Sequence, residues 1–416
     1  MRIFKFGGAS VKDAKGVLNL VSVLEKVGHE QTLIVVSAMG KTTNALEKVI
    51  DHYYKDKTNL GTSLLEFETF HNDIVSELFD NKKHDIFKKI KFLCEELKGF
   101  FKRNKSPDYN FIYDQVIGYG ELVSTTIVSA YLNEKGLTNH WLDVRELIKT
   151  DDYYRRANID WQQTQVQTKS RIDSKILNIT QGFLGSDANG FTTTLGREGS
   201  DYTAAILAYC LNAESVTIWK DVPGVLNADP RYFENTHLLN SISYREAIEL
   251  AFYGASVIHP KTLQPLQQKE IPLYVKSFLN PNNNGTVVGK GRGIEPNLPC
   301  FILKKNQVLI KLSSLDFSYI VEENISEIFK LLHFYKMKVD VIQNSAISFS
   351  VCFENSYGNL DKLIQHLKAK FKVSYYENVN LYTVRHYNES AQKNIEKGKN
   401  LLLKQLTRET MQIVTT

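Results

Sequence analysis

A lysine and two glycines mark the end of the first strand that the sequence predicts. The apolar run Ile3–Phe6 predicts a buried strand, with Lys5 inside it and Gly7 and Gly8 directly after it. Glycines after a buried parallel strand let backbone N–H groups approach a phosphate closely, and a nearby lysine reaches the same phosphate. A tight turn with a solvent-directed lysine explains these residues equally well. The phosphate-binding motif GxxxxGK(S/T) is absent.

Two other segments present hydroxyl and carboxyl groups near predicted helix starts. Ser37 and Thr43 follow or end the β-branched run Thr32–Ser37 and precede a helix, so they suit either a helix cap or a binding loop. Glu121 opens the apolar helix Leu122–Leu132, where a carboxylate already favours the helix dipole. Ser37, Thr43 and Glu121 can bind a ligand only if the fold brings their segments close to the other polar loops.

The loop 192–202 (TTTLGREGSDY) concentrates more polar donors than a structural loop needs. Arg197 offers two parallel N–H groups to a carboxylate or a phosphate. Asp201 can bind an ammonium group or Mg²⁺, or orient a nucleophile, and it lies just before the predicted helix Thr203–Leu211. We therefore favour a functional role for this loop.

Lys220, Asp221 and Arg231 follow the predicted strand Val216–Trp219. An acid at a strand end suits a nucleotide ribose or a metal, and an arginine suits phosphates. A turn closed by an Asp229–Arg231 pair is the alternative. Because ligands of parallel α/β sheets bind beyond the carboxyl ends of the strands, this segment predicts the nucleotide side of a cleft.

Strands that alternate with helices must position these residues. Such alternation indicates an α/β fold with a mainly parallel sheet. The stretch 45–103 is helical and charged, and we interpret its lysine run at 82–89 as a solvated helix face. The predicted strands are Ile3–Phe6, Thr32–Ser37, Asn139–Asp143, Ile176–Gln181, Val216–Trp219 and Leu273–Lys276.

The C-terminal part has a different pattern. A stretch at 280–299 rich in Asn, Gly and Pro predicts a linker. Elements in the order βαββαβ then span 306–377 and predict a ferredoxin-like sheet with helices on one face. A strand (Leu381–Arg385), a helix (Ala391–Leu406) and a strand (Met411–Val414) follow, and we expect Phe301–Lys304 to join them.

The composition is that of a globular protein with more than one core. The 416 residues are 43% hydrophobic and 23% charged, which excludes a disordered chain. A net charge of +5 is too small to indicate nucleic-acid binding. The four dispersed cysteines predict buried, reduced thiols. Because Met1–Gly8 has the pattern of a strand that ends in glycines, we expect no cleavable leader, and no apolar run reaches membrane length. We expect a cytoplasmic protein with no membrane or nucleic-acid partner and no metal site built from protein ligands.

Together these segments resemble the aspartate kinases of the amino-acid kinase family. The resemblance rests on KFGGAS (5–10), VVSAMGKTTN (35–44), GYGELVST (118–125), QGFLG (181–185), TTTLGREGSDYTAA (192–205), WKDVPGV (219–225), DPR (229–231) and YGASVIHPKT (253–262). It implies a catalytic three-layer α/β/α sandwich over 1–298, followed by a regulatory region of ferredoxin-like ACT modules over 299–416. Residues 306–377 resemble one complete ACT module, and 378–416 resemble a shortened second one.

The resemblance also implies a reaction: ATP with Mg²⁺ phosphorylates L-aspartate to 4-phospho-L-aspartate, the first step toward lysine, threonine and methionine. Lys5 then neutralises charge on the moving phosphoryl group, and Asp201 orients the amino group of aspartate and the site. Because the carboxylate nucleophile is already ionised at neutral pH, no general base is required. The implied aspartate-binding residues are Ser37, Thr43, Glu121 and Arg197, and the implied nucleotide-binding residues are Lys5, Gly7, Gly8, Lys220, Asp221 and Arg231.

An effector and a homo-oligomer follow from the resemblance to ACT modules. Asp340 would pair with the ammonium group of an effector, with lysine as the candidate, and Asn344 and Ser345 would hydrogen-bond it. Glu322 and Glu323 depart from the pattern because they would repel an effector carboxylate. A module kept only for dimerisation is therefore the alternative. We expect a homodimer or larger homo-oligomer formed through the ACT region.

Two positions of the catalytic part depart from the family. Ser256 stands where many members have a lysine beside the nucleotide, and Lys261 is the candidate substitute. Leu226 replaces an aromatic residue, which affects adenine packing. The alternatives to an aspartate kinase are another small-acid kinase of the same fold and a catalytically inactive, amino-acid-binding regulatory protein.

Overall fold

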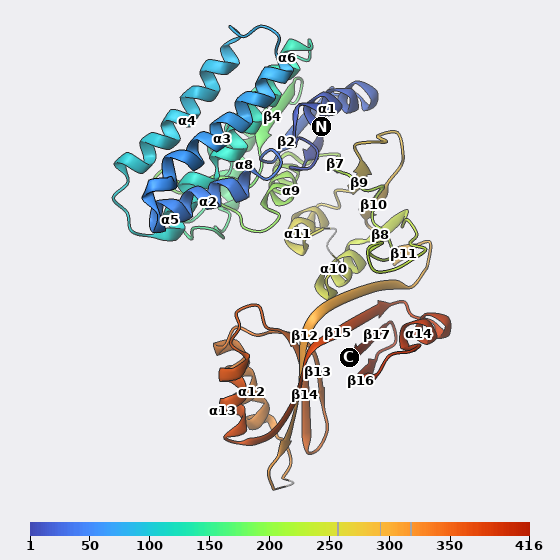
Figure 1. The fold of residues 1–416 in the computed structure, drawn as a ribbon. Coiled ribbons are helices and arrows are strands. Elements are labelled where there is room, and N and C mark those ends of the chain that lie inside the picture. The colour runs from blue at the N-terminus through green and yellow to red at the C-terminus, as the bar shows by residue number, and fades with distance from the viewer. Residues whose placement is uncertain (256–257, 292, 317) are drawn as a thin grey trace. The chain divides into compact units, whose positions relative to one another are not determined.

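The computed structural model describes residues 1–255, 258–291, 293–316 and 318–416, and these form two compact units (Figure 1). The first unit comprises Met1–Val225, Leu238–Ile248 and Ile258–Gly293. The second comprises Leu226–His237, Glu249–Val257 and Ile294–Thr416. Each unit has its own hydrophobic core.

A mainly parallel sheet runs through the first unit in the order β8-β10-β9-β7-β1-β2-β4-β3. The central strand β1 pairs in parallel with β2 and β7, and β10 runs antiparallel to β9. The strands are β1 (Arg2–Phe6), β2 (Thr32–Val36), β3 (Asn139–Leu142), β4 (Leu177–Gln181), β7 (Ser215–Lys220), β8 (Ser241–Ser243), β9 (Leu273–Ser277) and β10 (Thr286–Gly289). The short strands β5 (Leu184–Ser186) and β6 (Thr192–Thr194) form a separate antiparallel pair.

Helices cover both faces of this sheet, as the three-layer prediction requires. One layer contains α1 (Ala14–Val27), α2 (Thr42–Lys55), α3 (Lys57–Leu78), α4 (Asp85–Arg103), α5 (Tyr109–Ile117) and α6 (Tyr119–Glu134). The other contains α7 (Val144–Leu147), α8 (Trp161–Arg171), α9 (Gly199–Leu211) and α11 (Pro260–Gln268), with α9 packed on β1, β2 and β7. Helix α10 (Tyr244–Tyr253) follows β8.

The residue pattern explains why these elements form. All five residues of β2 (TLIVV) are buried, as expected for a parallel strand covered on both faces. In α1 the buried residues Val17, Leu20, Val21 and Leu24 recur at helical spacing. Asp13 caps the helix by accepting a 2.8 Å hydrogen bond from the N–H of Gly16.

The predicted linker at 280–299 is partly wrong, because it contains β10 of the main sheet. Thr286 fixes this strand: its buried hydroxyl donates to the carbonyl of Leu239 and accepts from the N–H of Val225, over 2.5 and 2.8 Å. The short strand β11 (Ile294–Glu295) also lies in this stretch. The turn residues at 280–285 therefore form a connection between strands, and their composition resembles that of a linker.

The second unit contains a six-stranded antiparallel sheet in the order β13-β14-β12-β15-β17-β16. Helices α12 (Glu322–Phe334) and α13 (Leu360–Lys368) pack on one face around the predicted βαββαβ core. The long strands β12 and β15 pair along both halves, including Phe301–Lys304 with Leu381–Val384. The remaining elements are β12 (Cys300–Ser314), β13 (Lys338–Asn344), β14 (Ser348–Glu354), β15 (Phe371–Arg385), α14 (Glu389–Glu396), β16 (Leu401–Leu406) and β17 (Thr410–Thr415).

The predicted helix Ala391–Leu406 is wrong in its second half. Helix α14 ends at Glu396, and Gly398 adopts a left-handed conformation with φ of 69°, which favours glycine and stops a helix. Residues Leu401–Leu406 form β16 and pair with β17. The expectation of buried cysteines holds, because Cys94, Cys210, Cys300 and Cys352 are all buried. Across the described ranges, no helix is long and apolar enough to cross a membrane.

Candidate active site

Lys5 and Asp201 form a buried ion pair near the carboxyl end of the central strand. Lys5 lies in β1, between Val35 of β2 and Ile218 of β7. Its Nζ is 2.5 Å from Oδ1 of Asp201, which lies in the first turn of α9, and the two side chains are only 10% and 5% exposed. The structure therefore brings the two predicted catalytic residues into direct contact.

The glycines after β1 allow two loops to touch. A Cβ atom on Gly8 would lie 2.9 Å from the carbonyl oxygen of Ala38, and the N–H of Gly40 donates to the carbonyl of Gly8 over 3.1 Å. A Cβ atom on Gly7 would lie 3.2 Å from Nζ of Lys5. The absence of side chains therefore keeps the loop after β1 close to the loop after β2 and leaves bare backbone next to the Lys5 ammonium group.

Ser37 and Thr43 lie at the two ends of the loop after β2. The N–H of Ser37 donates to the carbonyl of Phe6 over 3.1 Å, which ties the ends of β1 and β2 together. Thr43 is half-buried in the first turn of α2. Neighbouring Thr42, whose hydroxyl donates to the Met39 carbonyl over 2.5 Å, closes the turn at the helix start. Within the described residues, the hydroxyls of Ser37 and Thr43 have no hydrogen-bond partner.

Glu121 is a buried acid whose carboxyl group faces the same loop. Its Oε1 accepts a 3.4 Å hydrogen bond from the N–H of Ala38, and Oε2 is buried without a partner among the residues that the structure describes. Burial raises the pKa of Glu121 to about 8, against smaller opposing contributions from the Ala38 N–H and the charge of Lys5. The carboxyl group of Glu121 contacts the loop after β2. A favourable interaction with the dipole of α6 is therefore not the only effect of placing a carboxylate at this position.

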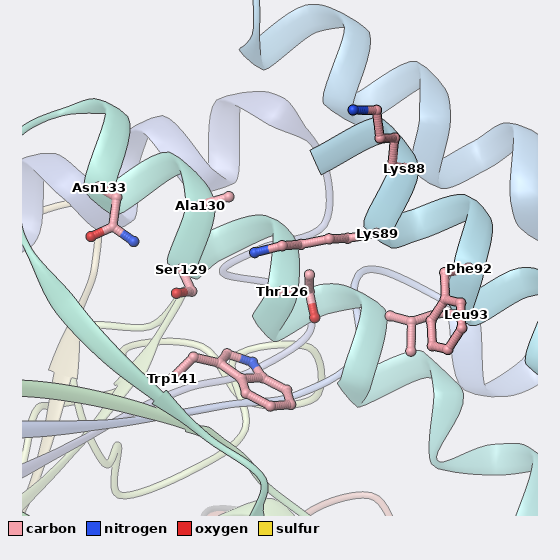
Figure 2. Close-up of a pocket in the computed structure, with 9 residues that line it drawn as sticks. All are labelled: Lys88, Lys89, Phe92, Leu93, Thr126, Ser129, Ala130, Asn133 and Trp141. Carbon is pink, nitrogen blue, oxygen red and sulfur yellow. The ribbon is translucent and has the colours of Figure 1, made fainter. Parts of the chain in front are cut away.

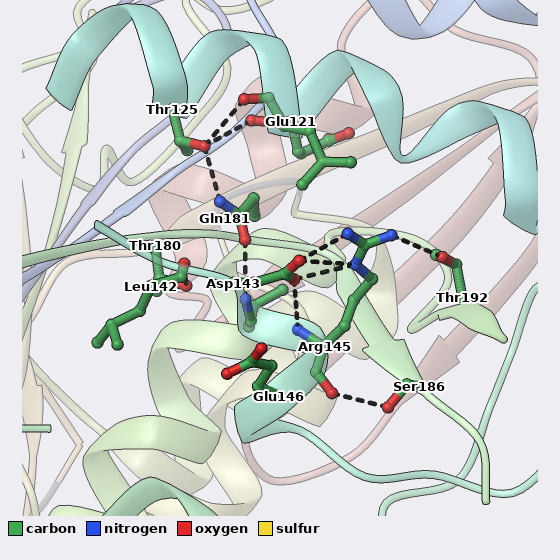
Figure 3. A network of polar contacts seen from close by, with 12 residues as sticks. Glu121, Thr125, Leu142, Asp143, Arg145, Glu146, Thr180, Gln181, Ser186 and Thr192 are labelled. Carbon is green, nitrogen blue, oxygen red and sulfur yellow. Dashed lines mark hydrogen bonds and ion pairs between the residues drawn. The ribbon is translucent and has the colours of Figure 1, made fainter. Parts of the chain in front are cut away.

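A polar network connects α6 with the loops that carry the other site residues (Figure 3). Nε2 of Gln181 donates to Oγ1 of Thr125 over 2.8 Å, and Oε1 of Gln181 accepts from the N–H of Val144 over 2.8 Å. Arg145 pairs with Asp143 and donates from Nη1 to Oγ1 of Thr192 over 3.2 Å. The network fixes the end of β4 and the start of β6. The loop that carries Arg197 follows β6.

Asp114 is a structural acid that sequence analysis did not single out. It lies in α5 and accepts hydrogen bonds from the N–H of Arg155 and from both the N–H and hydroxyl of Thr194, over 2.8 to 2.9 Å. Burial raises its pKa to about 6. The available signal was an acid inside the apolar helix FIYDQVI, where a charge needs a partner. Asp114 holds the end of β6, three residues before Arg197.

Arg197 lies on an exposed turn between β6 and α9. Its guanidinium group makes no hydrogen bond or ion pair with a described residue. The next residue, Glu198, has a left-handed backbone with φ of 54° and carries a buried Oε2 without a partner in the described part of the chain. The turn therefore presents an uncommitted cation beside the N-terminus of α9, where Asp201 lies.

The predicted nucleotide residues fall into both units. Lys220 ends β7, the strand beside β1, and exposed Asp221 follows it in the first unit. Arg231 belongs to the second unit, where its guanidinium pairs with the Asp229 carboxylate over 2.6 Å at an exposed turn. The sequence analysis gave this turn, closed by the Asp229–Arg231 pair, as the alternative to a nucleotide-binding segment. The nucleotide role of Arg231 stays a prediction.

Lys261 lies beside the loop of Arg197 and Asp201. Its Nζ is 3.5 Å from the carbonyl oxygen of Leu195 and 5.0 Å from the centre of the Tyr202 ring. Burial lowers the pKa of Lys261. A role at the nucleotide stays a prediction, and Ser256, which motivated it, lies outside the described residues. Leu226 is half-buried in the second unit.

The predicted effector residues lie on β13 and just after it. The Asp340 carboxylate is 2.6 Å from Nζ of Lys304. Asn344 and Ser345 are exposed, and the Ser345 hydroxyl lies 2.6 Å from that of Ser348.

A cavity of about 450 Å³ lies elsewhere in the first unit, between α4, α6 and β3 (Figure 2). In that view Lys89 extends from α4 toward α6, while Lys88 turns away. Its walls are formed by Lys88, Lys89, Phe92, Leu93, Thr126, Ser129, Ala130, Asn133 and Trp141. None of the predicted site residues lines it, so this cavity is separate from the candidate active site.

Comparison with known proteins agrees with this geometry. Residues 1–277 match the model of the amino acid kinase family. The chain is 32% identical over 366 residues to lysine-sensitive aspartokinase 3 of Escherichia coli, covering 85% of this chain and 78% of that protein. It is 34% identical over 298 residues to a bifunctional aspartokinase/homoserine dehydrogenase of Buchnera aphidicola, covering 69% of this chain but 36% of that protein.

Solved structures show the same similarity. The fold matches E. coli aspartokinase III in complex with lysine and aspartate with a TM-score of 0.83 and 28% identity, covering 100% of this chain and 95% of that one. It matches the same enzyme in complex with aspartate and ADP with a TM-score of 0.81 and 28% identity, covering 100% and 96%.

The chain therefore belongs to the amino acid kinase family. Within that family it is an aspartokinase, and the predicted phosphorylation of aspartate on the route to lysine, threonine and methionine is confirmed. The predicted α/β/α sandwich, followed by an antiparallel sheet that fits ACT-like modules, is confirmed as well.

Proposed function

We propose that Lys5 and Asp201 mark the point at which the γ-phosphoryl group of ATP passes to the side-chain carboxylate of L-aspartate. The observation that carries this proposal is their buried 2.5 Å ion pair at the carboxyl end of β1, next to the N-terminus of α9. Ligands of parallel α/β sheets bind at this edge. Solved E. coli aspartokinase III, in complex with aspartate and ADP, has the same fold.

The reaction joins an oxygen of the aspartate side-chain carboxylate to the γ-phosphorus. The bond between that phosphorus and the oxygen bridging to the β-phosphate breaks, and ADP leaves with the electron pair. No proton is transferred, because the carboxylate is ionised at neutral pH. The protein therefore acts by positioning the two substrates and stabilising charge.

Lys5 is the residue that stabilises this charge. Its ammonium group lies beside the bare backbone of Gly7, where phosphate oxygens can approach both the ammonium and the backbone N–H groups. Asp201 holds the ammonium in this direction through the ion pair. Because both side chains are almost fully buried, the interaction with a phosphate is only weakly screened by water.

Aspartate binding falls to residues on three loops. Oε2 of Glu121, which has no hydrogen-bond partner among the described residues, is the acceptor for the α-ammonium group. Arg197 supplies a bidentate partner for the α-carboxylate, since its guanidinium group pairs with none of the residues that the structure describes. Ser37 and Thr43 add hydroxyl groups at the ends of the loop after β2.

ATP binding involves Gly7, Gly8, Lys220 and Asp221 of the first unit, and Mg²⁺ accompanies the nucleotide. A phosphate-binding role for Arg231 is proposed from its sequence motif alone. Among the described residues, no three His, Cys, Asp or Glu side chains gather as a metal-binding cluster. Mg²⁺ is commonly held by substrate phosphates, water and one or two carboxylates. Asp201, in the first turn of α9, and Asp221, directly after β7, are the candidate carboxylates. The ion neutralises phosphate charge when it is bound.

The second unit senses lysine and joins copies of the chain. A lysine-sensitive relative and a solved aspartokinase in complex with lysine support the effector. Asp340 pairs with its side-chain ammonium, and Asn344 and Ser345 hydrogen-bond it. The exposed apolar side chains of Leu315, Tyr319 and Phe334 support a homodimer or larger homo-oligomer formed through this unit.

An ADP-release assay tests the activity. Purified protein with ATP and Mg²⁺ is supplied separately with L-aspartate, L-glutamate and N-acetyl-L-glutamate. Of the three amino acids, we expect only L-aspartate to give rapid ADP release. Removal of Mg²⁺ with EDTA should block this release. Equal rates with glutamate would contradict the assignment to aspartate, and a rate without an amino acid that equals the aspartate rate would contradict phosphoryl transfer to it.

A further inference from the structure

Asp340 is set apart from the rest of β13 by a β-bulge. The pairing with β14 passes from Val339 opposite Phe353 to Val341 opposite Cys352, so Asp340 is the extra residue. A bulge redirects the side chain of its extra residue. The Asp340 side chain is 7% exposed, although it carries a carboxylate.

Lys304 is the counter-charge of this buried carboxylate. Its Nζ lies 2.6 Å from Oδ1 of Asp340. Lys304 belongs to β12, and β14 separates β12 from β13 in the sheet, so the lysine side chain reaches two strands across. At 17% exposure, its ammonium-bearing side chain is largely removed from water.

Only one of the two oxygens of the Asp340 carboxylate contacts Lys304. Oδ2 of Asp340 is buried and has no hydrogen-bond partner in the described residues. Buried carboxylates normally accept hydrogen bonds at both oxygens. The neighbouring Cys352 thiol has a pKa raised to about 12, mainly by burial, with a further contribution from the Asp340 charge. The Asp340 carboxylate therefore lies in a largely buried environment, where it pairs with one ammonium group.

The stem of Lys304 also packs against the segment after α10. A Cβ atom on Gly254 would lie 2.6 Å from Cε of Lys304. Gly254 adopts a φ of 114°, which favours glycine. A movement of the Lys304 side chain therefore changes the contact with the backbone at Gly254, within the motif YGASVIHPKT.

We propose that Lys304 is an internal substitute for the effector ammonium and that lysine binds Asp340 by displacing it. The inference rests on the proposed role of Asp340 as the effector carboxylate. Two ammonium groups on one buried carboxylate would leave an uncompensated charge, so the incoming group replaces Lys304. Lys304 thereby sets the affinity for lysine, and its departure releases the contact with Gly254.

Calorimetric titration of the full chain with L-lysine tests this inference. In Lys304→Met the carboxylate has lost its internal partner, so we expect lysine to bind at least roughly tenfold more tightly than to the wild type. The affinity for norleucine, which lacks the side-chain ammonium group, should be the same in Lys304→Met as in the wild type. Lys305→Met is the matched control, because Lys305 is the exposed neighbour whose Nζ lies 4.2 Å from the Tyr232 ring centre.

Two further variants keep the test decisive. Lys304→Gln retains a hydrogen-bond donor without charge and serves if Lys304→Met does not fold. Adding Asp340→Asn to either Lys304 variant should abolish the increase in affinity for lysine. Equal or weaker lysine binding in both Lys304 variants, with binding by the wild type, would overturn the inference while leaving the effector proposal intact. An absence of lysine binding in every variant would overturn both, and aspartate-dependent ADP release would still report the kinase activity separately.

Discussion

Lys5 is the residue on which the proposed chemistry depends most directly. Its ammonium group is buried beside Asp201 and beside the glycine backbone after β1. An ammonium group at this position stabilises charge that develops as the phosphoryl group moves, which affects the transition state more than the bound substrates.

Lys5→Ala should therefore lower kcat by at least about 100-fold. Steady-state ADP release measures it, with circular dichroism to confirm the fold, since the change leaves Asp201 buried without its partner. Lys15→Ala, at an exposed position of α1, is the control and should behave like the wild type. A folded Lys5→Ala enzyme with kcat within a few-fold of the wild type would remove Lys5 from the mechanism.

Glu121 should make aspartate binding depend on pH. Burial raises its pKa to about 8 in the free protein, and only the ionised carboxylate pairs with the α-ammonium group. The KM for aspartate should therefore fall by about tenfold for each pH unit between pH 6 and 8 and level off above that range. In Glu121→Gln we expect a high KM that does not vary with pH. A flat KM in the wild type would show that Glu121 does not bind the substrate.

Arg197→Ala should raise the KM for aspartate by about 10- to 100-fold, because a charged hydrogen-bonded partner is lost. The KM for ATP should change by less than roughly threefold. Arg197→Lys should recover only part of the loss, since a lysine has no planar fork. Steady-state kinetics with each substrate varied in turn provides both constants, and equal effects on the two would reject the carboxylate clamp.

Sequence analysis predicted site residues that lie near the carboxyl ends of strands or in the first turns of helices, and their convergence follows from the parallel topology. Lys5, Glu121 and Asp201 meet because β1 and the N-termini of α6 and α9 share one edge of the sheet. The residues that support them were harder to find. Asp114 lies 80 positions before the Thr194 that it holds, and Lys304 meets Asp340 through a bulge 36 positions away. No local pattern encodes such pairings.

At the scale of elements, α3 contains a buried histidine that makes folding sensitive to acid. His71 is fully buried between Phe67 and Phe70, and burial lowers its pKa to about 4. Its usual value is 6.5, so the unfolded chain binds more protons than the folded protein between pH 6.5 and 4. The stability associated with neutral His71 is thus complete above pH 6.5 and is lost as the pH falls through this window.

Replacing His71 by Gln should remove this sensitivity. Between pH 7 and pH 5, the wild type should lose about 2 kcal/mol more stability than His71→Gln. Urea unfolding of both proteins at both pH values measures the difference, and other titrating groups cancel in the comparison. Identical losses in the two proteins would assign the acid sensitivity to other residues.

Most helices and strands follow from periodicity, and the errors have local causes. Six strands of the main sheet (β1, β2, β3, β4, β7 and β9) were predicted to within a residue at each end, because each is a short segment rich in apolar residues that alternates with a helical pattern. The helix at Ala391–Leu406 was extended too far because the run LLLKQL fits a helix as well as a strand. Pairing with β17 decides in favour of the strand. The strand β10 was hidden among turn residues, and the buried hydroxyl contacts of Thr286 fix it.

At the scale of the molecule, two separate cores predict two unfolding steps. Leu363 is fully buried in the core between α12, α13 and the second sheet. Leu363→Ala should lower the stability of this unit by about 2 to 5 kcal/mol and leave the first unit unchanged. Aspartate with ADP should stabilise the other step by mass action. Urea unfolding with and without these ligands tests both, and a single transition that shifts with either change would show that the units unfold together.

The two halves of the second sheet share β12 and β15. Leu309–Ser314 of β12 pair with residues 371–376 of β15, and Cys300–Lys304 pair with Leu381–Arg385. A gene break at 377/378 would divide β15 and leave two fragments, each with an unpaired strand edge of the kind that promotes aggregation. We therefore expect recombination that exchanges one half alone to produce a poorly folding, aggregation-prone chain. Lineages that gain, lose or exchange this region should do so in one cassette from Cys300 to Thr416.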